Sequence, residues 1–141
     1  MPDDSVIDEQ IVRQILDMQA EDDDGEAENG NLQFQAFYDQ AKEIISQLEE
    51  AQRSRDVDTI RRLGETLRPS SEGVGATQMT QRLIAIGGLF DPQNGRAINN
   101  DSITCASKAK GLIAVLELDL NQTKRTVEWF TKKYKEEKRG N

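Results

Sequence analysis

Side chains able to carry covalent chemistry are few in this chain of 141 residues, which contains no histidine and a single cysteine. The lack of histidine excludes Ser-His-Asp triads, Cys-His pairs, histidine-ligated zinc and phosphohistidine formation. Cys105 cannot form a disulfide within the chain and has no evident activating neighbour, so we expect a packed thiol. Ser70 and Ser71 have no histidine base, so we expect them to lie on a helix surface or to bond the helix backbone.

The most regular arrangement of charged side chains lies in residues 61–76, RRLGETLRPSSEGVGA. Four of its positions are separated by three or four residues and therefore share one face of a helix. These positions are Glu65, Arg68, Pro69 and Glu72. Arg61 precedes Glu65 by four residues, so this face is predicted to carry a ladder of exposed ion pairs, each worth about 0.3–0.5 kcal/mol.

Pro69 is the residue of this stretch that conflicts with a helix. Proline has no N–H, so it removes the bond to the carbonyl of Glu65, and its ring clashes with that carbonyl at a cost of about 3 kcal/mol. It also biases Arg68 away from helical backbone angles. The sequence therefore predicts a kink or a local break at residues 65–69, while packing holds the rest of the fold together.

The segment LGETLRPSSEGVGA resembles the motif of histidine-phosphotransfer (HPt) domains, which reads roughly L-G-H-x-L-K-G-S-S-A-x-x-G. The matching residues, in ungapped register, are Leu63, Gly64, Leu67, Ser70, Ser71 and Gly75. The preceding sequence, with QILDM, an acidic stretch and the aromatic FYDQA, is similar to the fungal phosphorelay intermediates of this family. The resemblance covers most of residues 6–135.

The resemblance implies a four-helix bundle with an exposed histidine that passes a phosphoryl group between receiver-domain aspartates, assisted by a lysine and a glycine. In this chain Glu65 stands at the phosphoacceptor position, Arg68 at the lysine, Pro69 at the glycine and Glu72 at the small residue after the serines. Gly87 stands where fungal members have a helper glutamine. The reactive face is therefore predicted to have lost phosphotransfer, and we expect no enzyme activity, no cofactor and no metal.

Three interpretations follow from this pattern. In the first, the chain is a pseudo-HPt protein that binds response-regulator receiver domains without passing phosphate. Its contact surface would then be Glu65, Arg68, Pro69 and Glu72 with an apolar patch around Ile11 and Ile15. In the second, it is an inactivated variant of a genuine phosphorelay intermediate. In the third, it is a helical adaptor unrelated to phosphorelays, and the motif matches by chance.

Apolar residues at spacings of three and four predict five helices, at residues 6–18, 32–52, 57–74, 79 to about 88, and from about 102 onward. The expected N-caps are Asp4 or Ser5, Asp56, and Asp101 or Ser102. The expected connections are an acidic loop at 19–31, a GVGA turn, a loop at 91–101 and a basic tail at 135–141. The fold class is therefore all-α, a single domain over 1–141 built as an antiparallel four-helix bundle with an extra short N-terminal helix.

The formal net charge of −8 makes nucleic acid and anionic membrane surfaces unfavourable partners. The sequence has no 18-residue apolar run and its first residues are acidic, so we expect a cytoplasmic location, with the nucleus as an additional compartment. We also expect a monomer. The acidic loop does not fit a calcium-binding loop, because Ala20 and Asn31 would occupy its first and last ligand positions.

Overall fold

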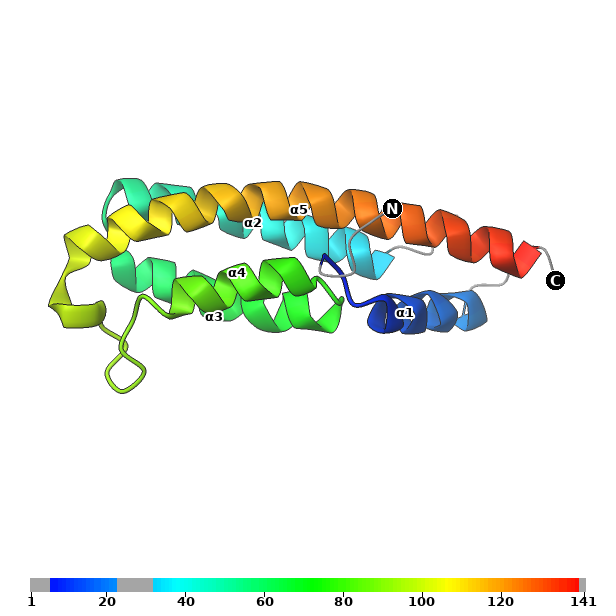
Figure 1. The fold of residues 1–141 in the computed structure, drawn as a ribbon, viewed down its shortest axis with the longest axis horizontal. Helices are drawn as coiled ribbons and strands as arrows, with labels where there is room; N and C mark the ends of the chain where they lie inside the picture. Colours follow the sequence, from blue (N-terminus) through cyan, green and yellow to red (C-terminus); the bar gives the residue numbers. More distant parts are fainter. Residues whose placement is uncertain (1–5, 23–31, 140–141) are drawn as a thin grey trace.

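The computed structural model describes residues 6–22 and 32–139, and their backbone is almost entirely helical (Figure 1). The helices are α1 Glu9–Asp22, α2 Leu32–Arg53, α3 Val57–Gly73, α4 Thr77–Gly87 and α5 Ser102–Arg139, with a short 3-10 turn η2 at Ile98–Asn100. Within these two ranges no β-strand forms, and Phe90 and Ala97 make an isolated bridge. The all-α class predicted from the sequence is confirmed.

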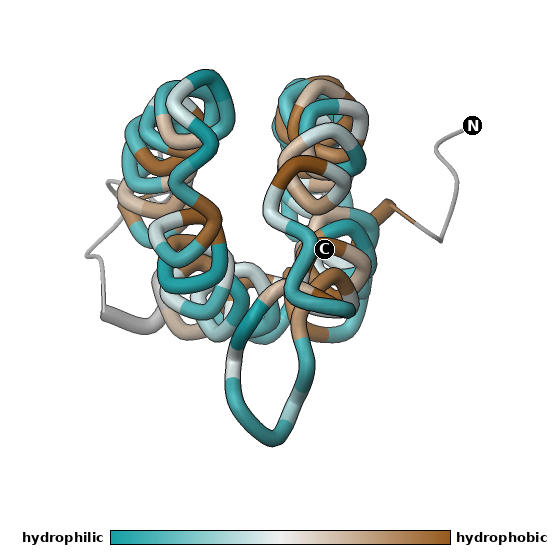
Figure 2. Tube along the Cα trace, turned by 90° about the vertical axis from the view of Figure 1, so that its left-hand side faces the viewer, coloured by the Kyte–Doolittle hydropathy of each residue, from teal (hydrophilic) through white to brown (hydrophobic). Residues whose placement is uncertain are grey.

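Helices α2 to α5 pack in a closed cycle, in which α2 contacts α3, α3 contacts α4, α4 contacts α5 and α5 returns to α2. In Figure 1, α2 and α5 form the upper side of the bundle, and α3 and α4 form the lower side. Neighbouring helices in this cycle run antiparallel. Figure 2 looks along the bundle from the end at which α5 begins and shows the 91–97 loop projecting away from it. The predicted antiparallel four-helix bundle is thus the observed architecture.

The core is formed by one apolar stripe from each helix, as the spacing predicts. Its largest fully buried apolar side chains are Phe34, Leu48, Ile60, Leu67, Met79, Ile86 and Leu116. Burying one such side chain stabilises the fold by about 1.5–3 kcal/mol, which exceeds any single surface ion pair in the protein. Core packing of the four stripes therefore fixes the orientation of each helix, and with it the side chains that each helix presents to solvent.

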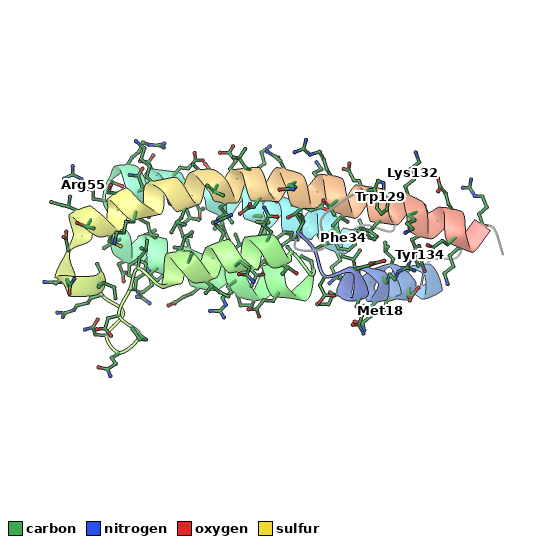
Figure 3. All side chains as sticks on the ribbon, in the orientation of Figure 1. Met18, Phe34, Arg55, Trp129, Lys132 and Tyr134 are labelled. Carbon is green, nitrogen blue, oxygen red and sulfur yellow. The ribbon has the colours of Figure 1, made fainter. Side chains whose placement is uncertain are left out.

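Helix α1 is the extra N-terminal helix, and it packs beside the end of α5 that extends past the other helices (Figure 1). Tyr134 lies between the two helices (Figure 3), and its hydroxyl donates to Oδ1 of Asp17 at 2.6 Å. Arg13 pairs with Glu137 at 3.0 Å. The side chain of Trp129, also in α5, is 41% exposed.

Aspartates cap the helices where the sequence predicts for α3 and α5. Oδ1 of Asp56 accepts from the backbone N–H of Thr59 at 3.2 Å, and Oδ1 of Asp101 accepts from that of Thr104 at 3.0 Å. The predicted start of the first helix is wrong. Asp8 accepts from the backbone N–H groups that follow it, while Asp4 and Ser5 lie outside the described residues.

The first helix begins late because the residues before it are tied to the turn between α3 and α4. The N–H of Asp8 donates to the carbonyl of Gly75 at 2.8 Å, and the N–H of Gln78 donates to the carbonyl of Val6 at 3.2 Å. Val6 and Ile7 are buried there instead of forming a helical turn. These contacts hold the N-terminal segment against the end of α3.

Three segments predicted as loops or tail contain regular structure. Residues 19–22 of the acidic loop continue α1, and the remainder of that loop, 23–31, lies outside the described residues. Residues 135–139 of the basic tail form the end of α5. The positive charges of Lys138 and Arg139 stabilise this end, because the helix dipole is negative there. The 91–101 loop contains the Phe90–Ala97 bridge and η2.

Pro69 neither breaks nor ends its helix, because α3 continues from Val57 to Gly73 with Pro69 inside it. The predicted break at 65–69 is therefore wrong. Pro69 and Glu65 are both exposed, so water can bond the carbonyl that proline leaves without its N–H donor. On the opposite face, buried Leu67 and Ser71 anchor the helix on both sides of the proline.

Candidate functional site

The four positions at which the chain departs from the phosphotransfer motif form a continuous exposed strip on α3. We call Glu65, Arg68, Pro69 and Glu72 the α3 strip, and all four are exposed. Nε of Arg68 lies 3.1 Å from Oε1 of Glu72, and Arg61 lies 3.3 Å from Glu65. Arg61 also pairs with Asp58 at 2.8 Å. Among the described residues no ion pair joins Glu65 to Arg68, so the ladder consists of two separate steps.

The positions that match the motif occupy the buried face of the same helix. Gly64, Leu67 and Ser71 are buried, while Leu63 and Ser70 are half-buried. The hydroxyl of Ser71 donates to the carbonyl of Arg68 at 2.8 Å and lies 2.7 Å from the hydroxyl of Thr80 in α4. The sequence-based prediction that Ser71 bonds the helix backbone is confirmed, and the two faces separate as the spacing predicts.

Helix α4 contributes an apolar residue that the sequence analysis missed. Ser71 pairs with Thr80, and a methyl group added at Gly64 would lie 3.7 Å from Cγ2 of Ile86. Ile84 lies between these two positions in the sequence of α4, and its side chain is 45% exposed. An isoleucine outside the buried stripe of a helix is the signal that could have identified it.

Gly87, at the position of the family's helper glutamine, is also exposed on α4. A Cβ atom built there would meet nothing within 4 Å. The position next to Ile84 is therefore open space, and the chain supplies no side chain at the place where the resemblance implies an amide.

A shallow cavity of about 200 Å³ borders the strip at Glu72, and its walls come from the N-terminal segment, α3 and α4. Ile11 and Gly75 line this cavity. Ile15 does not line this cavity. Its side chain packs in the core and is 3% exposed. Of the two isoleucines predicted for partner binding, Ile11 therefore lies beside the strip, and the prediction for Ile15 is corrected.

The other end of the strip is bordered by the loop after α4. Gly95 has φ of +71°, and a Cβ atom there would lie 3.3 Å from Nε of Arg61. The N–H of Asp91 donates to the carbonyl of Arg96 at 2.7 Å, which closes the loop. The Asn-Gly pair of this loop signals a tight turn in the sequence. Its contact with Arg61, 34 positions earlier in the chain, has no sequence signal.

The site offers ionic and hydrogen-bonding groups but no ready nucleophile. Hydrogen bonds to Asp58 and then to Glu65 raise the pKa of the Arg61 guanidinium above its ordinary value. Burial raises the pKa of the Cys105 thiol, which agrees with a packed thiol. Across residues 6–22 and 32–139, no three acidic, histidine or cysteine side chains gather as metal ligands would.

The fold is an all-α bundle, and the site is an exposed charged strip on its helix α3. No protein-family model matches the chain. A search of curated proteins also gives no significant sequence match. In the part of the chain that the structure describes, no helix has both the length and the apolar character needed to cross a bilayer.

Proposed function

We propose that this chain is a pseudo-HPt protein, a phosphotransfer-like bundle that binds response-regulator receiver domains through the α3 strip and does not carry phosphate. Its signalling role would be that of a modulator or decoy in a phosphorelay. It would act as a monomer in the cytoplasm, and in the nucleus where receivers are present.

The division of α3 into two faces is the observation that carries this proposal. The motif positions that would hold a bundle together are buried at Gly64, Leu67 and Ser71. The positions that would meet a receiver are exposed and replaced at Glu65 and Pro69. Changes without selection would fall on both faces within the limits of core packing, whereas these replacements lie together on the exposed face.

The chemistry of the strip supports binding without transfer. A carboxylate such as Glu65 accepts a phosphoryl group only as an acyl phosphate, which requires an activated donor and a metal-bearing site. Arg68 keeps a positive charge at the position of the family's lysine and can donate two parallel bonds to a carboxylate. Ile84 and Ile11 add apolar surface on either side.

Isothermal titration with purified receiver domains tests the proposal. We expect binding that Arg68→Glu weakens about tenfold, because it reverses the charge at the centre of the strip. Arg125→Glu is the matched control, since Arg125 is exposed on α5 and lies outside the strip. Failure to bind any of several receivers, or equal losses in both variants, would contradict the proposal.

Phosphoryl transfer is measured separately with a labelled phospho-receiver. The natural chain should acquire no label, and the double variant Glu65→His with Pro69→Gly should acquire it if the bundle descends from a phosphotransfer protein. Receiver binding without label transfer to the double variant would favour an adaptor that has no phosphotransfer ancestry.

A further inference from the structure

A groove runs along the seam between α2 and α5, on the side of the bundle opposite the α3 strip. Two cavities, of about 330 Å³ and 430 Å³, open along this seam. Both are lined by Glu49 of α2 and Glu117 of α5, so they are halves of one groove. In Figure 1 this seam lies on the upper side, while α3 and α4 form the lower side.

The floor of the groove is apolar and its rims are charged. Ile45, Ile113 and Leu120 line the floor as core residues that are 3%, 3% and 9% exposed, and the exposed side chain of Ala114 adds apolar surface beside them. Its α2 wall extends from Gln35 to Arg53, a helical length of about 27 Å at 1.5 Å per residue. An apolar floor of this length between two antiparallel helices suits a third helix lying along the seam.

The charges on the rims repeat every seven residues. Lys110, Glu117 and Lys124 follow this spacing on α5, and Lys42 and Glu49 follow it on α2. Charges at a seven-residue spacing that flank an apolar seam are the arrangement by which coiled-coil helices select their partners. Because the two helices are antiparallel, the glutamates lie at the middle of the groove and the lysines lie toward its ends.

These rim charges have no counter-ions among the described residues of the bundle. Within the described ranges, no ion pair engages the five rim residues just named. Lys124 lies over the ring of Tyr38, 5.7 Å from its centroid. Asp39 also lines that end, which leaves two positive charges and one negative charge there.

Tyr38 adds an unsatisfied polar group to the same wall. Its hydroxyl oxygen is buried and has no hydrogen-bond partner in the described part of the chain. Burying a hydroxyl without a partner is unfavourable. A glutamate placed between Lys42 and Lys124 could pair with both lysines.

We propose that the α2–α5 groove docks an amphipathic helix of a partner protein whose flanking charges read acidic, basic, acidic at seven-residue intervals. Its apolar face lies on the narrow strip formed by Ala114 and the exposed edges of Ile113 and Leu120. Its central basic residue lies between Glu49 and Glu117, and its acidic residues lie near the lysines at either end. The groove and the α3 strip are on opposite sides, so the chain can hold two partners at once. This inference does not depend on the receiver-binding proposal.

A synthetic helical peptide of about 21 residues, with leucine at the a and d positions and Glu, Lys and Glu in successive heptads, is the first reagent. Its charge-reversed counterpart, with Lys, Glu and Lys, is the matched control. Fluorescence anisotropy of each labelled peptide, measured against the full chain below the concentration at which the peptide self-associates, should show the first binding at least about tenfold more tightly. Equal binding of both peptides, or binding of neither, overturns the proposal.

Two variants locate the binding. The double reversal Glu49→Lys with Glu117→Lys should invert the preference between the two peptides. Ala114→Trp should abolish binding of both by filling the groove, since Ala114 is exposed and lines it. Circular dichroism verifies that each variant remains folded. Unchanged preference in the first variant, or unchanged affinity in the second, places the peptide elsewhere and overturns the proposal.

An environment-sensitive dye gives an independent readout of position. Ser46→Cys places a reactive thiol in the groove, and the natural Cys105 is buried. The dye signal at position 46 should change when the peptide binds, whereas a dye on Ser107→Cys, on an exposed position of α5 that lines neither half of the groove, should not respond. A response at position 107 alone contradicts the assignment.

Discussion

The hydroxyl oxygens of Ser71 in α3 and Thr80 in α4 lie 2.7 Å apart in the buried seam between the two helices. Ser71 can also donate to the carbonyl of Arg68, and Thr80 can donate to that of Ala76. Two hydroxyl protons are available for these three contacts. If one hydroxyl donates to the other, only one of the two carbonyls, that of Arg68 or that of Ala76, accepts from a hydroxyl as well. This pair joins the face of α3 opposite the strip to the rest of the bundle.

Ser71→Ala should lower the free energy of unfolding by about 1–2 kcal/mol, because it leaves Thr80 without its buried partner. Thr80→Val should cost a similar amount. Since the double variant removes both groups, its loss should be smaller than the sum by about 0.5–1 kcal/mol. Urea denaturation of the four proteins measures this coupling, and strict additivity would show that the hydroxyls do not interact.

Gly64 and Gly75 should respond in opposite ways to alanine. At Gly64 a methyl group would meet Ile86 at an ordinary 3.7 Å, so the gain in helix propensity should stabilise the fold by up to about 1 kcal/mol. Gly75 has φ of +74°, and its Cβ would lie 3.1 Å from the carbonyl oxygen of Asp8, so alanine should destabilise by at least about 1 kcal/mol. Thermal unfolding of both variants tests the contrast, and equal shifts in melting temperature would contradict it.

Pro69→Gly should raise the melting temperature, because it restores the N–H that bonds the carbonyl of Glu65 and removes the clash of the ring. Pro69→Ala should raise it further, since alanine is favoured over glycine by about 1 kcal/mol within a helix. Pro69 is exposed, so neither replacement disturbs the core. A fall or no change in melting temperature for both variants would show that α3 accommodates proline without cost.

The sequence predicts the bundle well because its information is local: apolar spacing sets each helix, and Asp56 and Asp101 mark two starts. It fails at Val6 and Ile7, whose burial depends on bonds to Gly75 and the next helix. It also predicts a break at Pro69 that does not occur, since local propensity does not include the packing of Leu67 and Ser71. In the candidate site, the shared face of the strip follows from helical spacing, whereas its border at Gly95 is a tertiary contact with Arg61.

Caps at Asp56 and Asp101 should make stability depend on pH in the acid range. Hydrogen bonds from Thr59, and from the backbone N–H and then the hydroxyl of Thr104, lower the pKa values of these carboxyls below their ordinary 3.8. A lowered pKa in the folded state gives stability that is present above pH 3.8 and lost as the pH falls through the folded-state pKa. Asp56→Asn with Asp101→Asn should flatten the acid limb of a plot of unfolding free energy against pH. An unchanged limb would assign the acid sensitivity to other carboxyls.

Asp119 is the buried charge that orients α4 on α5, and only 2% of it is exposed. Its two carboxylate oxygens accept from Nε2 of Gln78 at 2.6 Å and from Nε of Arg82 at 3.0 Å. Removing the cation while the carboxylate remains leaves a buried charge without its partner, so Arg82→Ala should destabilise by about 3–5 kcal/mol. Asp119→Leu with Arg82→Met replaces the pair by apolar groups of similar volume, and should recover most of that loss because no buried charge remains. Chemical denaturation of the two variants distinguishes the outcomes, and an equal loss in both would show that packing volume at this site, rather than the unpaired charge, determines the cost.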